Sequence, residues 1–156
     1  MKKTNAMREL EKSKINYEGI EYKVNEEYLG AIHVASQTGT DITKVFKTLA
    51  TVNEKNELII ACIPGSDEID LKKLATISGN KKIEMLEMKK LQERTGYIRG
   101  GCSPLGIKKR HESYIHESAL TKDYIYISAG QKGLQIKIVP KDLINYLKMN
   151  IGNIIN

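Results

Sequence analysis

One charged side chain lies inside a run of residues that is otherwise patterned as a buried strand. Lys47 stands in the segment Val-Phe-Lys-Thr-Leu-Ala-Thr-Val, residues 45–52, and no other residue of that run is charged. An ammonium group without a partner is costly to bury, so such a lysine faces a cleft, meets a carboxylate or extends its head to solvent. Lys47 is therefore a candidate cleft residue, and a lysine at the edge of a strand is an equally good interpretation.

A glycine-rich segment downstream has the composition of a ligand-binding loop. Residues 95–106 read Thr-Gly-Tyr-Ile-Arg-Gly-Gly-Cys-Ser-Pro-Leu-Gly, with four glycines and one proline. Glycine lets the backbone approach a ligand closely and turn its amide N–H groups toward an anion or an oxyanion. The spacings of phosphate-binding and dinucleotide-binding loops are absent, so we expect no nucleotide cofactor. A loop with a purely structural role has the same composition.

The cysteines and histidines are weaker candidates. Cys102, with His111 and His116 downstream, suggests a cysteine nucleophile activated by a histidine. No local signature of a cysteine hydrolase surrounds Cys102, however. Cys62 and Cys102 form no CxxC or Cys/His spacing, which indicates reduced thiols. Three scattered histidines predict no metal site, and we expect His33 to be structural or exposed.

Positive charge is concentrated in one segment. The chain of 156 residues has a net charge of +6, yet residues 72–110 hold eleven Lys and Arg against three acids, a net +8 that leaves −2 for the rest. A basic segment on a mildly acidic body suggests a face for a polyanion, with Lys108, Lys109 and Arg110 as candidate contacts. A solvated lysine-rich surface is an equally good interpretation of the charge alone.

The composition fits one soluble globular domain. Hydrophobic residues make up 40% and charged residues 28% of the chain, whose length is enough to bury one sizeable core. No window approaches the ~20 uncharged apolar residues of a membrane span, and no apolar stretch follows the charged start as in a secretory signal. We expect a single domain over residues 1–156, in the cytoplasm and without a membrane partner.

Helix and strand signals alternate along the chain. Helices are expected where capping residues and glycine stops bracket an apolar face, at residues 4–14, 32–37, 71–78, 88–94 and 141–148. Strands are expected in apolar, β-branched runs at residues 17–24, 45–52, 58–63, 82–86, 113–115, 124–128 and 134–139. Residues 53–56 predict a hairpin turn, and residues 128–133 a second hairpin turn or a pocket wall. The pattern predicts one mixed α/β domain, a single largely antiparallel sheet with flanking helices.

Five blocks of this sequence resemble the YbaK/EbsC family. They are Val-Phe-Lys-Thr-Leu at 45–49, Asp-Leu-Lys-Lys at 70–73, Thr-Gly-Tyr at 95–97, Gly-Gly-Cys-Ser-Pro-Leu-Gly-Ile-Lys-Lys-Arg at 100–110 and Ile-Ser-Ala-Gly-Gln-Lys-Gly-Leu at 127–134. They occur in family order over nearly the whole chain. The sequence is most similar to YbaK-type Cys-tRNA(Pro) deacylases, relatives of the editing insertion domain of bacterial prolyl-tRNA synthetases.

The resemblance implies an α/β domain whose cleft takes the aminoacylated 3′ end of tRNA and removes a wrongly attached amino acid, cysteine above all. Lys47 matches the family lysine on which activity depends most. The family's substrate-binding positions correspond to Tyr22, Thr48, Gly100, Gly101 and Ser128, and the two glycines would present backbone amides to the ester or the ribose. The implied partners are Cys-tRNA(Pro), with Cys-tRNA(Cys) as a second substrate, and prolyl-tRNA synthetase.

The chain departs from its resemblance at two positions. Gln135 stands where close relatives carry an acid, and it can hydrogen-bond a substrate but cannot accept a proton as a carboxylate would. Cys102 replaces an aliphatic residue, and nothing in the family makes it a nucleophile. The resemblance implies instead that the thiol of the substrate cysteine attacks its own carbonyl and leaves a cyclic thiolactone. The alternatives are a non-catalytic tRNA- or synthetase-binding module of the same fold and a Cys102-dependent thiol hydrolase.

Overall fold

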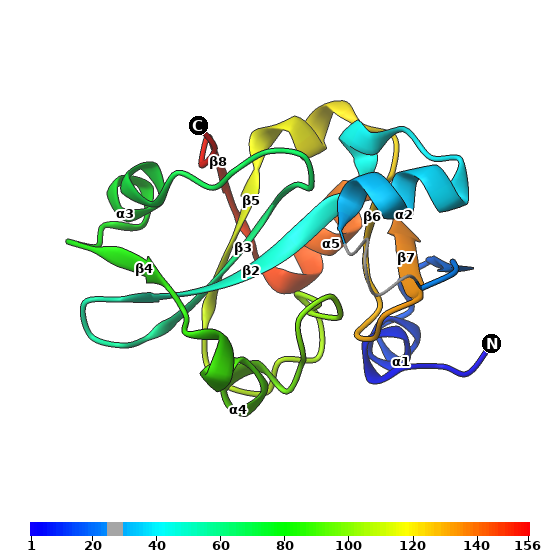
Figure 1. Cartoon of the computed structure of the whole chain (residues 1–156), viewed down its shortest axis with the longest axis horizontal. Coiled ribbons are helices and arrows are strands. Elements are labelled where there is room, and N and C mark those ends of the chain that lie inside the picture. The colour runs from blue at the N-terminus through cyan, green and yellow to red at the C-terminus, as the bar shows by residue number, and fades with distance from the viewer. Residues whose placement is uncertain (25–29) are drawn as a thin grey trace.

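The strands form two sheets in the computed structural model, which describes residues 1–24 and 30–156 (Figure 1). The strands are β1 (Glu18–Glu21), β2 (Phe46–Asn53), β3 (Leu58–Pro64), β4 (Ile83–Met85), β5 (Glu112–His116), β6 (Ile125–Ser128), β7 (Leu134–Ile138) and β8 (Asn150–Gly152). The α-helices are α1 (Asn5–Lys12), α2 (Ala31–Thr38), α3 (Leu71–Ser78), α4 (Leu91–Thr95) and α5 (Pro140–Leu147). Short 3₁₀ turns are Ile42–Lys44, Met88–Lys90 and Glu117–Thr121.

The larger sheet has the strand order β4-β2-β3-β5-β8 and the smaller one the order β1-β7-β6. Within the large sheet, β2 is antiparallel to both β3 and β4, whereas β5 is parallel to both β3 and β8. The small sheet is antiparallel throughout. A single parallel bridge between Val45 and Tyr126 joins the start of β2 to β6, so the two sheets meet at the N-terminal end of β2.

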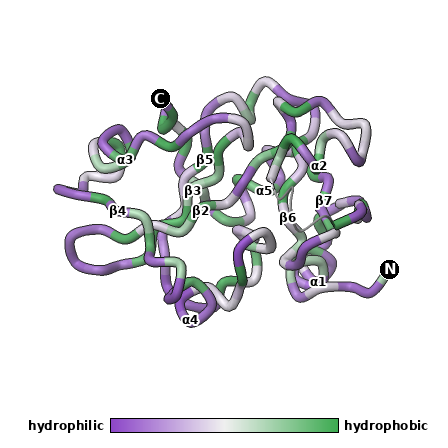
Figure 2. The backbone as a smooth tube through the Cα atoms, in the orientation of Figure 1, coloured by the Kyte–Doolittle hydropathy of each residue, from purple (hydrophilic) through white to green (hydrophobic). Residues whose placement is uncertain are grey.

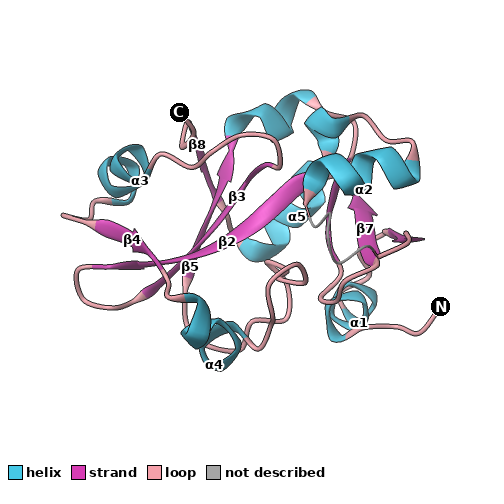
Figure 3. Ribbon diagram, viewed as in Figure 1, coloured by secondary structure: helices cyan, strands magenta, loops and turns pink. Residues whose placement is uncertain are grey.

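Helices cover the sheets through apolar faces that the sequence pattern anticipates. On α1, Ala6, Met7 and Leu10 are fully buried against the small sheet and α5, and α2 covers the opposite side of that sheet through Val34 and Ala35. On the large sheet, α3 packs against β3 and β5, while Leu91 of α4 packs against Ala50 and Leu58 on the other face. Figure 3 shows this layering, and Figure 2 shows apolar residues along the central strands and polar ones along the outer loops.

Local signals in the sequence account for most element boundaries. Thr4 accepts a hydrogen bond from Met7 N–H at the start of α1, and Asp70 does the same for Lys73 N–H at the start of α3. Gly79 ends α3 in the left-handed conformation. The predicted hairpin of β2 and β3 is confirmed, and so is the largely antiparallel α/β fold.

Three features differ from the sequence-based expectation. The strands divide into two sheets instead of one. The reason is that β2 contacts β6 only at the start of β2, whereas the C-terminal end of β2 pairs with β4. The first strand is shorter than expected, ending at Glu21. Glu117–Thr121 and β8 were not predicted, since Asn150 and Gly152 are poor strand formers whose pairing with β5 is non-local. None of the helices in residues 1–24 and 30–156 is long and apolar enough to cross a membrane.

Candidate active site

A pocket of about 350 Å³ lies where the two sheets meet. Its walls come from residues far apart in sequence: the first half of β2, the start of α2, the turn after β4, the glycine-rich loop, and the facing ends of β6 and β7. Six of the seven predicted catalytic and substrate-binding residues line it, namely Tyr22, Lys47, Thr48, Gly100, Ser128 and Gln135. The remaining one, Gly101, lies behind the wall, and Lys108, Lys109 and Arg110 are exposed outside the pocket.

The pocket lining is cationic. Lys47 and Arg99 both line it, and none of its described lining residues is an Asp or a Glu. Neither cation makes a hydrogen bond or an ion pair with any residue in the described part of the chain. Because two cations face the pocket with no carboxylate in its described lining, this lining favours an anionic or electron-rich ligand.

The backbone of β2 has one residue at the pocket wall with no neighbouring described strand on the side away from β3. In an antiparallel pair, alternate residues direct N–H and C=O toward the partner strand and the others direct theirs away. The C=O of Val45 accepts from Gly65 N–H at 2.7 Å on the β3 side. The C=O of Ala50 accepts from Leu86 N–H at 3.0 Å on the opposite side.

Thr48 has the same parity as Ala50, so its backbone N–H and C=O also point away from β3. Within the described residues, the β4 ladder begins only beyond Ala50 and the β6 bridge lies at Val45. No described strand therefore covers the edge at Thr48, and the alternation directs its N–H and C=O toward the pocket side of β2. Burial of unpaired backbone groups is unfavourable, and a ligand that pairs with them gains affinity.

Ser128 and Gln135 form the polar end of the pocket and are direct neighbours across β6 and β7. Ser128 Oγ accepts a hydrogen bond from Gly130 N–H at 3.1 Å, which fixes the side chain and leaves its own O–H available to donate. Gln135 is only 5% exposed, and its Oε1 atom has no hydrogen-bond partner among the described residues. A buried acceptor without a hydrogen-bond partner destabilises the fold by about 1–3 kcal/mol, so a ligand that donates a hydrogen bond to this atom would be favoured.

Contacts from two helices hold the glycine-rich loop in place. At its end, Gly106 N–H donates to Glu9 Oε2 of α1 at 2.8 Å, and the other oxygen of Glu9 accepts from Tyr146 of α5 at 2.7 Å. The Tyr97 hydroxyl donates to the carbonyl of Leu105, which closes the loop on itself. The loop is therefore a fixed wall of the pocket.

The two central glycines of the loop have different roles. Gly100 lines the pocket with φ at +85°, a conformation that favours glycine. Gly101 instead packs on the 130–133 turn, where an added Cβ would lie 3.1 Å from Gln131 Cα. Its N–H already donates to Ile98 C=O at 3.0 Å. Gly101 therefore lies outside the described pocket lining with its N–H used inside the loop, and its role in substrate binding stays a prediction.

Cys102 also lines the pocket, and its side chain is half-buried. Burial raises the pKa of the Cys102 thiol to about 11, and a contact with Thr95 lowers it only in part. The histidines of the proposed pair have other partners: His111 Nδ1 contacts Lys109 C=O and His116 Nδ1 contacts Ser118 Oγ. The protonated thiol and these partners argue against a cysteine nucleophile. No group of three His, Cys, Asp or Glu side chains suited to a metal ion occurs in residues 1–24 and 30–156.

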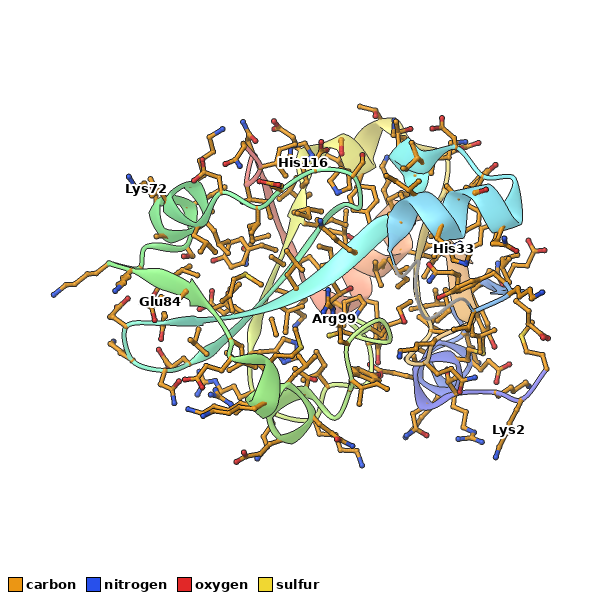
Figure 4. The ribbon with its side chains drawn as sticks, viewed as in Figure 1. Lys2, His33, Lys72, Glu84, Arg99 and His116 are labelled. Carbon is orange, nitrogen blue, oxygen red and sulfur yellow. The ribbon has the colours of Figure 1, made fainter. Side chains whose placement is uncertain are left out.

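Sequence reasoning missed two polar residues of the pocket. His33 lines it from α2, with its ring edge-on to that of Tyr22 at 6.5 Å between centroids. Arg99 lines it from the glycine-rich loop (Figure 4). The sequence held one signal for Arg99, which is its place directly before the two adjacent glycines, but the path of the loop relative to β2 was not predictable.

Comparisons with known proteins agree with this architecture. Residues 26–146 match the family model described as an aminoacyl-tRNA editing domain. A protein of Enterococcus faecalis named "Putative Cys-tRNA(Pro)/Cys-tRNA(Cys) deacylase EbsC" is 48% identical over 143 residues, which cover 92% of this chain and 87% of that protein.

Two solved structures share the fold. The hypothetical protein APE2540 superposes with a TM-score of 0.89 at 14% identity, covering 98% of this chain and all of that one. A structure described as "a putative trans-editing enzyme for prolyl tRNA synthetase" gives a TM-score of 0.82 at 18% identity, covering 97% of this chain and 92% of that one. With the family match over most of the sequence, the chain belongs to the aminoacyl-tRNA editing domain family.

Proposed function

We propose that this chain is a deacylase that removes cysteine from mischarged Cys-tRNA(Pro), with Cys-tRNA(Cys) as a second substrate. The observation that carries the proposal is the pocket: it joins two unpaired cations, an open strand edge and an unsatisfied polar end, and its described lining holds no carboxylate. The name of the 48% identical relative supports the same activity and the same two substrates. We place the activity in the cytoplasm, where tRNA is charged and edited.

The size of the pocket supports a small ester as its ligand. A volume of about 350 Å³ lies at the low end of ligand clefts, suited to an amino acid with its terminal ribose and too small for a tRNA stem. The stem would then lie outside, where the exposed Lys108, Lys109 and Arg110 contact phosphates without reading sequence.

The chemistry asked of the site is modest, because an aminoacyl ester is already activated. Positioning of the ester and stabilisation of the developing oxyanion supply most of the rate acceleration that the reaction needs. The N–H groups of Thr48 and Gly100 are the candidate oxyanion donors, and Lys47 adds a positive charge to the same wall. Removing one donor of this kind costs about 10²–10³ in rate in known enzymes.

Gln135 supports recognition of the amino acid itself. The buried Oε1 atom of Gln135 is a hydrogen-bond acceptor, so it can pair with the ammonium group of the aminoacyl ester or with a ribose hydroxyl. The O–H of Ser128 donates beside it. The amide is uncharged at every accessible pH, so recognition at this position does not titrate as it would with the acid of close relatives.

We assign the attack to the substrate thiol, because no nucleophile–base pair is present in the described pocket lining. The sulfur of cysteine forms a bond to its own carbonyl carbon and the ester C–O bond to the ribose breaks. The thiol proton passes to the ribose oxygen, and the product is a four-membered thiolactone that water then opens. Proximity drives this intramolecular step. A prolyl-tRNA synthetase that delivers the mischarged tRNA is the partner we propose.

A tRNA-binding module without turnover is the alternative, and the lack of a carboxylate in the described lining favours it. Single-turnover deacylation of tRNA(Pro) charged with cysteine, serine or alanine separates the two. We expect cysteinyl-tRNA to be cleared far faster than the other two, with a thiolactone that can be trapped before it hydrolyses. Equal clearance of alanyl-tRNA would contradict thiol attack, and binding without clearance of any substrate would leave only the module.

A further inference from the structure

Arg99 is a pocket cation to which neither the sequence pattern nor the proposed reaction assigns a task. It belongs to the glycine-rich loop, is exposed to solvent and lines the pocket beside Gly100. It forms no hydrogen bond or ion pair with residues 1–24 or 30–156. Figure 4 shows it on the loop beneath β2, far from Lys72 on α3.

Some basic side chains of the same segment already have partners. Arg94 donates to the carbonyl of Asn56 at 2.9 Å, and Lys82 pairs with Glu84 at 2.7 Å. Lys89 and Lys90 both lie within 4 Å of the carboxylate of Glu87, at 3.4 and 3.8 Å. Other basic side chains of the segment also have no partner in the described chain, and Arg99 differs from them because it lines the pocket.

The polarity of the pocket sets the direction in which a ligand lies. Gln135 and Ser128 form its buried polar end, whereas Arg99 and Gly100 are exposed at its mouth. An aminoacylated nucleotide that places its amino acid against Gln135 directs the rest of the nucleotide toward Arg99. The nearest anion on that path is the phosphodiester attached to the 5′ oxygen of the same ribose.

We propose that Arg99 binds the phosphodiester between the last two nucleotides of the tRNA, as a binding residue separate from Lys47. The proposal rests on the proposed function. The guanidinium offers a planar fork of N–H donors that matches two phosphate oxygens, and it stays charged at all accessible pH values. The absence of Asp and Glu from the described lining leaves the phosphate as the counter-charge.

Binding of short ligands tests this without any turnover. Cytidylyl-(3′→5′)-adenosine contains the phosphodiester, adenosine lacks it, and inorganic phosphate measures the bare anion site. The intact chain should bind the dinucleotide more tightly than adenosine, and Arg99→Gln should lower the dinucleotide affinity about 10- to 100-fold toward that of adenosine. Arg99→Lys should keep part of the preference, and the matched surface variant Lys72→Gln should keep all of it. An unchanged dinucleotide affinity in folded Arg99→Gln overturns the proposal.

Kinetics separates this proposal from the proposed function. Arg99→Gln should raise KM for Cys-tRNA(Pro) with little change in kcat, because the contact is made equally in ground and transition states. The ratio of kcat/KM for Cys-tRNA(Pro) to that for 2′(3′)-O-cysteinyl-adenosine, which has no phosphate, should fall 10- to 100-fold. If the intact chain cleaves both esters and this ratio does not move, the Arg99 proposal fails and the deacylase stands. If it cleaves neither, the deacylase fails, and dinucleotide binding still decides the role of Arg99.

Discussion

Replacing Gly101 by alanine should move the glycine-rich loop without removing any functional group. An added Cβ would lie 3.1 Å from Gln131 Cα, closer than ordinary van der Waals contact, and in ordinary contact with the C and N atoms of Gln131 at 3.4 and 3.5 Å. The contacted atoms are backbone of the 130–133 turn, which Ala129 N–H to Leu134 C=O at 3.0 Å and Gly130 N–H to Ser128 Oγ at 3.1 Å hold in place. The loop must therefore shift by a few tenths of an ångström, and Gly100 and Arg99 shift with it.

The magnitude follows from two opposing effects. Overpacking a close contact costs about 1–3 kcal/mol, and the lower chain entropy of alanine in the unfolded state returns about 0.4–1 kcal/mol. We expect a net loss of roughly 0.5–2 kcal/mol in the free energy of unfolding. Because a displacement of about 1 Å can cost about 100-fold in rate, a shift of a few tenths should lower single-turnover deacylation about 10-fold.

The assay pairs urea unfolding with single-turnover clearance of Cys-tRNA(Pro), and Gly79→Ala is the matched control. Gly79 has φ at +72° and open space around it, so alanine there loses about 1 kcal/mol to backbone strain with no effect on the pocket. Both variants should lose similar stability, and only Gly101→Ala should lose activity. Full activity in Gly101→Ala, or an equal loss in Gly79→Ala, would refute the assignment of the loop as a fixed wall of the site.

Three further outcomes are expected. Cys102→Ser should retain most of the deacylation rate, since the thiol is protonated and has no histidine partner in the described chain; a loss as large as that of a Lys47 variant would restore the nucleophile interpretation. With its pKa raised to about 11, roughly 0.1% of Cys102 is thiolate at pH 8. The rate of its alkylation by iodoacetamide should therefore be about 100-fold lower than that of an ordinary cysteine, and this rate should rise about tenfold for each pH unit. Reversal of Lys108, Lys109 and Arg110 to glutamate should weaken tRNA binding and flatten the slope of log K against log salt by about 2–3, and an unchanged slope would mean that these side chains are only a solvated face.

Local signals predicted the elements of this fold well. The caps at Thr4 and Asp70, the stop at Gly79 and the β2–β3 hairpin each follow from a few neighbouring residues. What could not be predicted depends on pairing across the chain. Nothing near β5 indicates that it lies parallel between β3 and β8, and its partners are about fifty and thirty-five residues away in sequence.

The residues of the candidate site likewise divide into those with a local signal in the sequence and those whose position depends on packing across the chain. Lys47 could be singled out because a charge in an apolar strand conflicts with its surroundings, a local signal. The positions of Arg99 and His33 in the pocket depend on how the loop and α2 pack against β2, which no short-range pattern records. The use of Gly101 N–H by Ile98 was likewise hidden, because composition shows that a loop can present amides but not which of them its own turn consumes.

The most direct test of the account is single-turnover deacylation of Cys-tRNA(Pro) by Lys47→Ala. The Lys47 side chain is partly exposed and makes no hydrogen bond or ion pair with the described part of the chain, so its loss should change the free energy of unfolding by less than about 1 kcal/mol. Removing the charge from the pocket wall should lower the rate by about 10²–10³, while circular dichroism and urea unfolding remain as in the parent chain. A folded Lys47→Ala that clears Cys-tRNA(Pro) within a few-fold of the parent rate would contradict the assignment of this pocket as the editing site.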